Sequence, residues 1–166
     1  AGKTETLAQR ADFLLRTSTC SYPRRILAIS FKKDASENLK ERVSTRCGHQ
    51  LASRFDSYTF HAFAKRLIDI FRTHLQGIDR LDEDYTIGTF RVSRSQIMFE
   101  DMVPLANDIV SQCEIARNSI RQTYSDVFLD EFQDCTATQY SLVINAFQGS
   151  GVRIVAVGDI KQKIMG

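Results

Sequence analysis

The chain has 166 residues, of which 43% are hydrophobic and 25% charged, a composition typical of one globular domain with a buried core. With 8 glycines and 2 prolines it does not resemble a disordered or fibrous chain, and no apolar run approaches the about 18 residues that a membrane span requires. Residues 1–80 carry 15 Lys and Arg against 8 Asp and Glu, whereas residues 81–166 carry 7 against 12; a basic half suits a nucleic-acid surface, although charge alone favours ordinary solvated faces.

Hydrophobic periodicity predicts the following elements in the first half of the chain: a helix at 4–15, a strand at 25–31, a helix at 35–46, a strand at 55–59 and a helix from 60 to about 75. The helix at 35–46 is expected to have Asp34 as its N-cap and to end at Cys47-Gly48. In the second half, the pattern predicts a mainly helical stretch at 95–118, a strand at 126–130, a helix at 137–147 and a strand at 152–157. Residues 76–95 are polar and irregular. Strands that alternate with helices predict an α/β fold, with a parallel sheet covered by helices on both faces.

The cysteines and histidines are scattered along the chain. None of the four cysteines forms a CxxC pair, and no histidine stands near enough in sequence to complete a zinc site. We therefore expect free thiols in a reducing compartment, and a cytoplasmic protein.

Polar residues follow the predicted strands at the point where each strand ends. In open α/β sheets this edge is where ligands bind. Ser30 and Thr59 follow two strands, and the residues expected to gather at the same edge are Lys3, Thr4, Asp130, Glu131, Asp159 and Gln162.

Gly2-Lys3-Thr4 matches the end of the phosphate-binding pattern GxxxxGK[ST]. Backbone N–H groups at a helix N-terminus face phosphates, Lys3 would reach the β- and γ-phosphates, and the Thr4 hydroxyl would bind Mg²⁺. The tripeptide alone favours an ordinary helix start over a phosphate-binding loop.

Asp130-Glu131 strengthens the case for a nucleotide site. An Asp at the end of an apolar strand can hold Mg²⁺, and the adjacent Glu can orient the water that attacks a γ-phosphate. The alternative is a solvated turn that caps the next helix through Asp134 or Thr136.

Several segments together resemble one family. Residues 129–134, LDEFQD, resemble the Walker B motif of the UvrD/Rep/PcrA group of superfamily-one DNA helicases. Further segments match that family in order: AGKT at 1–4, ISFKKDA through Arg42, YTFHAF at 58–63, FEDM at 99–102 and VGDIKQ at 157–162. The chain departs from the family at 32–34, where Lys-Lys-Asp replaces Thr-Asn-Lys, and at 163–165, where Lys-Ile-Met replaces Ser-Ile-Tyr.

The resemblance implies a P-loop NTPase fold of the RecA-like type. Residues 1–166 would form an incomplete first RecA-like ATP-binding domain, in which 76–122 is a reduced, mainly helical insertion. The chain starts without Met and ends directly after a strand-like run, so we expect a piece of a longer protein.

The resemblance also assigns roles to individual residues. Mg-ATP would be bound by Gly2, Lys3, Thr4, Asp130, Glu131 and Gln162, with Thr4 and Asp130 at the metal and Lys3, Glu131 and Gln162 in catalysis. Ser30, Phe31, Thr59 and His61 would lie along single-stranded DNA, in agreement with a basic groove that carries aromatic platforms. Phe31 as a core residue and His61 as a cap of the following helix are the alternatives.

The implied function is that of an ATP-dependent DNA helicase or translocase that moves 3′ to 5′. Its partners would be single-stranded DNA, junctions of single and double strands, and a second RecA-like domain of the same parent chain, without a membrane. The alternatives are a regulatory or scaffold module with a P-loop fold, a helicase–nuclease subunit without independent unwinding, and a small-molecule kinase.

Overall fold

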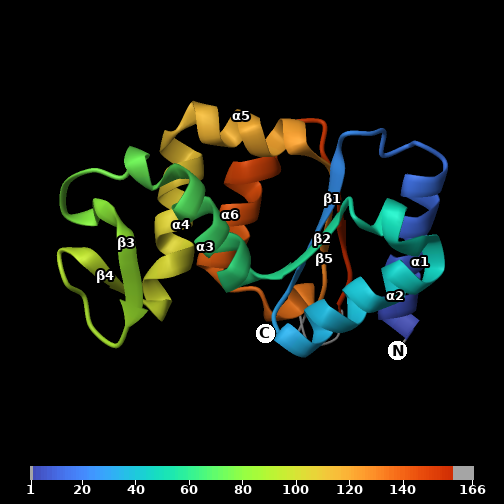
Figure 1. Cartoon of the computed structure of the whole chain (residues 1–166), viewed down its shortest axis with the longest axis horizontal. Coiled ribbons are helices and arrows are strands. Elements are labelled where there is room, and N and C mark those ends of the chain that lie inside the picture. Colours follow the sequence, from blue (N-terminus) through green and yellow to red (C-terminus); the bar gives the residue numbers. More distant parts are fainter. Residues whose placement is uncertain (1, 159–166) are drawn as a thin grey trace. The chain divides into compact units, whose positions relative to one another are not determined.

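The computed structural model describes residues 2–158 of the chain (Figure 1). It divides into two compact units, which are described here one at a time. The first unit is formed by residues 1–59, 121–135 and 149–166, and the second by residues 60–120 and 136–148.

The first unit contains a four-stranded parallel sheet in the order β2-β1-β5-β6. Its strands are β1 (Arg25–Ser30), β2 (Phe55–Thr59), β5 (Tyr124–Leu129) and β6 (Arg153–Ala156). Ser30 lies opposite Thr59, and Leu129 lies opposite both Ile29 and Ala156. The carboxyl ends of all four strands therefore meet at one edge, and the predicted parallel sheet is confirmed.

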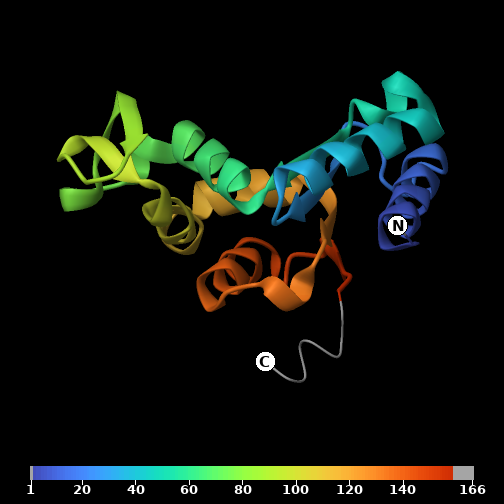
Figure 2. The same cartoon turned by 90° about the horizontal axis from the view of Figure 1, so that it is seen from below.

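Helices α1 (Gly2–Arg16) and α2 (Lys33–Ala52) lie side by side in both views of the chain (Figures 1 and 2). The apolar stripe predicted on the first helix is buried and joins residues of both helices and the sheet in one core cluster: Leu7, Ala8, Ala11, Leu14, Leu15, Leu39, Val43, Ile26, Ala28, Phe55 and Phe128. On the other face of the sheet, Leu27, Ile29 and Val127 are also fully buried. A strand buried on both faces is continuously apolar, as the sequence of β1 is.

The start of α2 differs from the prediction. The helix begins at Lys33, so Asp34 lies inside the first turn and is not the N-cap. A carboxylate in the first turn still interacts favourably with the helix dipole. Gly48 has a φ of +85° and interrupts the helix where its end was predicted, after which helical residues continue to Ala52.

The second unit contains most of the remaining helices: α3 (Phe60–Phe71), α4 (Met102–Gln112) and α6 (Ala137–Phe147), with α4 packed against both others. Helix α5 (Glu114–Thr123) leads back to β5. Helix α3 ends earlier than predicted and is followed by 3₁₀ turns at Arg72–His74 and Gly77–Asp79. Pro104 lies in the first turn of α4, where its missing N–H has no helical partner to lose.

Residues 81–98 contain a two-stranded parallel sheet, β3 (Leu81–Gly88) and β4 (Arg94–Met98). The predicted irregular segment at 76–95 and the predicted helical start at Ser95 are therefore wrong over these strands. Most residues of both strands are polar and only Leu81 and Ile97 are buried, so the alternation that marks a strand is weak.

Within residues 2–158, no helix has the length and hydropathy that would let it cross a membrane.

An ion pair between the half-exposed Arg153 side chain and the buried Asp126 carboxylate fixes β6 against β5. Arg153 donates from Nε to Asp126 Oδ1 at 2.6 Å and from Nη2 to Asp126 Oδ2 at 2.9 Å, and the two residues are partners in the strand register. Asp126 is only 2% exposed, and the Ser125 hydroxyl donates to the same carboxylate at 2.6 Å. This pair holds in place the strand that ends beside the acidic loop.

Arg153→Ala should strongly destabilise the protein, because it leaves the Asp126 carboxylate buried without its partner. We expect the free energy of unfolding to fall by about 2 kcal/mol, less than for a pair buried on both sides because the Arg153 side chain is half exposed, measured by urea denaturation and circular dichroism. The matched control is Lys33→Ala, which removes an exposed pair with Glu37 and should cost less than about 0.5 kcal/mol. Equal losses of the free energy of unfolding in the two variants would contradict the role given to the Asp126–Arg153 pair.

Candidate nucleotide site and nucleic-acid interface

The loop after β5 is tied to both neighbouring strands by backbone hydrogen bonds. The Asp130 N–H donates to Ile29 O at 3.0 Å, and the Val157 N–H donates to Leu129 O at 2.9 Å. The Phe132 N–H in turn donates to Val157 O at 2.9 Å. The acidic loop is therefore held at the carboxyl edge of the sheet.

Glu131 occupies a left-handed backbone conformation, with φ 57° and ψ 44°, that non-glycine residues seldom adopt. Its side chain accepts a hydrogen bond from Gln133 Nε2 at 2.6 Å. The Gln133 side chain also packs on Gly158, since a Cβ added there would stand 2.1 Å from Gln133 Oε1 and 3.1 Å from Phe132 N. The DEFQD segment and Val157-Gly158 thus pack together, and Gln133 holds the Glu131 carboxylate.

Asp130 is 6% exposed. Burial raises the pKa of its carboxyl above the usual range, the charge of Glu131 raises this pKa further, and the Lys3 ammonium acts in the opposite direction. Lys3, in the first turn of α1, is therefore close enough to Asp130 for its charge to matter. Asp130 and Glu131 follow β5 at the carboxyl edge of the sheet, and the charge of Lys3 acts on Asp130.

Two ion pairs hold the first turn of α1 against α2. Glu5 Oε2 accepts from Arg42 Nη1 at 3.0 Å, and Glu5 Oε1 accepts from Arg46 Nη1 at 2.7 Å. Arg42 is the arginine of the segment that starts at Ile29. Its contact fixes the helix whose N-terminus carries Gly2, Lys3 and Thr4.

The residues at this edge fit a magnesium ion that is bound together with phosphates. The buried Asp130 carboxylate next to Glu131 is unfavourable without a compensating cation, and the buried Ser30 hydroxyl has no hydrogen-bond partner among residues 2–158. That part of the chain contains no cluster of three or more His, Cys, Asp or Glu residues able to hold a metal. Mg²⁺ needs no such cluster, because it is commonly held by one or two side chains, waters and substrate phosphates.

Asp159 and Gln162 lie outside the described residues, so their predicted positions are not addressed by the structure.

The four residues predicted along DNA have different surroundings. Ser30 is completely buried, whereas Phe31 and Thr59 are half-buried at the carboxyl edge of the sheet. His61, in the first turn of α3 in the second unit, stacks on Phe99 with ring centroids 3.8 Å apart and an angle of 15° between the planes. Phe99 is 54% exposed. Sequence reasoning noticed both segments but missed this stack, because no local pattern links residues so far apart.

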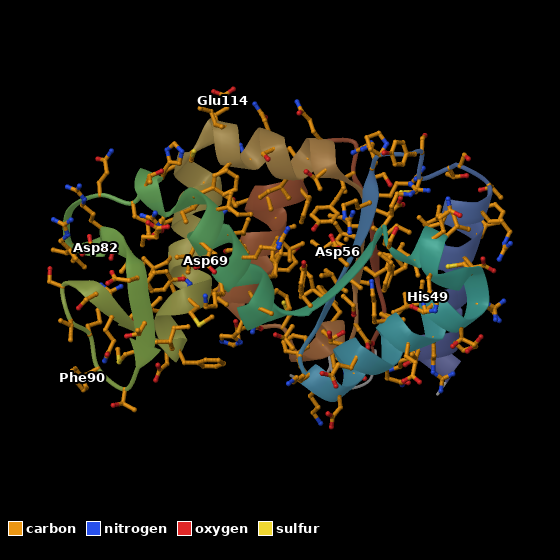
Figure 3. The ribbon with its side chains drawn as sticks, viewed as in Figure 1. His49, Asp56, Asp69, Asp82, Phe90 and Glu114 are labelled. Atoms are coloured by element: carbon orange, nitrogen blue, oxygen red, sulfur yellow. The ribbon has the colours of Figure 1, made fainter. Side chains whose placement is uncertain are left out.

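A polar network at the opposite edge of the sheet is structural. Asp56, labelled in Figure 3, accepts hydrogen bonds from Arg25 Nε at 2.9 Å and from the Tyr124 hydroxyl at 2.8 Å. Burial tends to raise the pKa of Asp56, but these two hydrogen bonds outweigh it and lower the pKa below its usual value. The network joins the beginnings of β1, β2 and β5, and thereby supports the register that aligns their far ends.

The acidic loop leads into α6 through a capping box. Thr136 is the N-cap: its hydroxyl accepts from the Gln139 N–H at 3.1 Å, while Gln139 Oε1 accepts from the Thr136 N–H at 3.0 Å. Of the two capping residues considered, Thr136 is confirmed. The cap is made by Thr136 and Gln139 and uses neither the Asp130 nor the Glu131 carboxylate.

A family model described as the UvrD/REP helicase N-terminal domain matches residues 1–98 and 90–166. The chain belongs to this family. Among curated relatives, this UvrD/REP helicase N-terminal domain is 23% identical to the Gabija protein GajB of Bacillus cereus (strain VD045), over 99% of the chain and 36% of the relative. It is 24% identical to the ATP-dependent DNA helicase PcrA of Leuconostoc citreum, over 100% of the chain and 30% of the relative.

The exonuclease/helicase subunit RexA of Lactococcus lactis subsp. cremoris (strain MG1363) is 24% identical over 70% of the chain and 9% of the relative. The UvrD/REP domain described here spans about a third of GajB and PcrA.

Burial lowers the pKa of His61 below its usual value. The folded protein therefore favours neutral His61, and its contribution to stability is present above the unfolded pKa of about 6.5 and is lost as the pH falls through the folded pKa. Phe99→Ala should expose the imidazole and raise the pKa of His61 back toward its ordinary value, as measured by an NMR titration.

The control is Phe90→Ala, which removes another exposed ring of the second unit and should leave the pKa of His61 unchanged (Figure 3). An unchanged pKa in both variants would mean that the stack does not bury His61.

Proposed function

We propose that the chain is an incomplete first RecA-like ATP-binding domain of a DNA helicase or translocase. The parent protein would couple Mg-ATP hydrolysis to 3′ to 5′ movement on single-stranded DNA. The observation that supports the proposal is the acidic loop held at the sheet edge, with the charge of Lys3 acting on Asp130, in a chain of the UvrD/REP helicase family.

Each residue of the nucleotide site has a distinct task. The backbone at Gly2 and the Lys3 ammonium bind the phosphates, and Thr4 and Asp130 hold the metal ion. Magnesium, when bound, neutralises the charge that develops on the phosphoryl oxygens. Glu131 orients the attacking water, with its carboxylate held by Gln133, and Gln162 contacts the γ-phosphate or that water.

Phe31, Thr59 and His61 are proposed to contact single-stranded DNA. A half-buried aromatic ring and the His61–Phe99 stack offer flat surfaces for bases, and the basic first half of the chain supplies charge for phosphates. Junctions of single and double strands would be partners of the parent protein, and residues 76–122 would be a reduced insertion in its first domain.

A second RecA-like domain of the parent chain is proposed to complete the ATP site. Arginines supplied across such a site stabilise transition-state charge and raise turnover by orders of magnitude. The chain alone should therefore hydrolyse ATP weakly. The free thiols of the four cysteines fit the proposed cytoplasmic location.

The second candidate is a helicase–nuclease subunit without independent unwinding. It is favoured by the similarity to RexA, whose name describes an exonuclease/helicase subunit. The same nucleotide site would then serve a larger assembly.

ATP hydrolysis by the full-length protein should be strongly stimulated by single-stranded DNA. Glu131→Gln should abolish turnover, by at least about 100-fold, while nucleotide affinity changes little, because the amide cannot activate water but preserves the shape of the side chain. A rate of ATP hydrolysis that does not change when DNA is added would support a kinase or scaffold module. Equal loss of nucleotide binding and turnover in Glu131→Gln would contradict the role of Glu131.

DNA affinity should fall steeply with salt, because phosphate contacts release counterions. Lys32 is exposed and directly follows Phe31. Lys32→Ala should make the slope of log affinity against log salt shallower by about 0.7, whereas Arg10→Ala, which changes an exposed residue of α1, should leave it unchanged. If the DNA affinity of the unmodified protein did not change with salt concentration, the basic half of the chain would be excluded as the DNA-binding surface.

A further inference from the structure

Ser30 is a buried polar residue whose hydroxyl has no hydrogen-bond partner. Its side chain is 0% exposed, and Oγ makes no hydrogen bond within residues 2–158. In that part of the chain, the one other buried side-chain N or O atom without a partner is Arg24 Nε. That guanidinium is bound elsewhere, since Arg24 Nη2 donates to Arg121 O at 2.7 Å. Burying a hydroxyl without replacing its hydrogen bonds to water lowers the stability of the folded protein. The unpartnered Ser30 hydroxyl therefore needs an explanation.

The strand register places Ser30 next to Asp130. Ile29 pairs with Leu129, and the Asp130 N–H continues the ladder to Ile29 O at 3.0 Å. Ser30 and Asp130 are therefore neighbours across adjacent strands, whose backbones lie about 4.8 Å apart. No direct hydrogen bond joins the Ser30 hydroxyl to the Asp130 carboxylate.

Both residues belong to the face of the sheet that α1 covers. Ala28 and Phe128, two residues earlier on each strand, pack in the core cluster with Leu7 of α1. Because side chains alternate along a strand, Ser30 and Asp130 lie on this same face. Lys3, whose charge acts on Asp130, is a residue of the same helix α1. Ser30 is thus on the nucleotide side of the sheet and is not at its surface.

We propose that Ser30 is a positioning residue of the magnesium site: its hydroxyl binds a water molecule in the coordination shell of the ion held by Asp130. This inference rests on the proposed nucleotide site. Mg²⁺ keeps several waters when one or two side chains bind it, and each such water is a strong donor that needs an acceptor. The Ser30 hydroxyl is a free acceptor beside the buried carboxylate. The role replaces the DNA contact that the sequence suggested for Ser30.

The test measures equilibrium binding of a fluorescent ADP to the full-length protein while Mg²⁺ is titrated, so that no turnover is involved. Ser30→Ala should raise the Mg²⁺ concentration at half-saturation by about fivefold, the effect of losing one modest hydrogen bond. Binding of the nucleotide without Mg²⁺ and binding of single-stranded DNA should not change. Ser30→Thr, which keeps the hydroxyl, should restore the Mg²⁺ dependence.

Ser30→Thr and Ser30→Val introduce side chains of nearly equal shape, of which only threonine has a hydroxyl. If the alanine variant does not fold, the Mg²⁺ concentration at half-saturation is compared between these two variants and should be higher for Ser30→Val. An unchanged Mg²⁺ dependence in Ser30→Ala, or weaker DNA binding alone, overturns the inference and leaves the proposed function intact. Failure of the unmodified protein to bind ADP at any Mg²⁺ concentration overturns both.

Discussion

The parallel register of β1, β5 and β6 is the constraint on which the candidate site depends. It brings three strand ends to one edge, and backbone hydrogen bonds from Asp130 to Ile29 and from Phe132 to Val157 continue the ladder past those ends. The Asp126–Arg153 pair supports the same register from within the sheet. Because backbone hydrogen bonds hold the acidic loop at this edge, its carboxylates are positioned without a bound ligand.

Such positioning has a cost in stability. The Asp130 carboxylate is buried beside Glu131, and both burial and the neighbouring charge oppose its ionisation. Glu131 adds a left-handed backbone conformation, and Ser30 adds an unsatisfied hydroxyl. Three unfavourable features at one strand edge are typical of a site that is completed by a ligand, since a bound cation and its waters would relieve two of them.

The sequence predicted secondary structure correctly where a single hydrophobic pattern dominates a segment. The apolar runs predicted the strands at 25–31, 55–59 and 126–130 to within about two residues, and the stripe on α1 predicted its buried side chains. It failed at β3 and β4, where polar residues are held by pairing with each other and few side chains are buried. The His61–Phe99 stack and the orphaned Ser30 hydroxyl depend on tertiary neighbours, which no local pattern encodes.

Ser30 and Phe31 connect the two proposed activities within a single stretch of backbone. Ser30 is buried on the face of the sheet that packs against α1, and the half-buried Phe31 follows it directly at the strand end. Consecutive Cα atoms are about 3.8 Å apart across a planar peptide unit, so Phe31 is the residue nearest in the chain to Ser30 on the side of the strand end. In the proposal, a change in the surroundings of Ser30 on cation binding would reach the backbone of Phe31 first. In this proposal, coupling between ATP and DNA requires no long pathway, because one peptide bond joins the residue that senses the metal site to the residue that contacts the base.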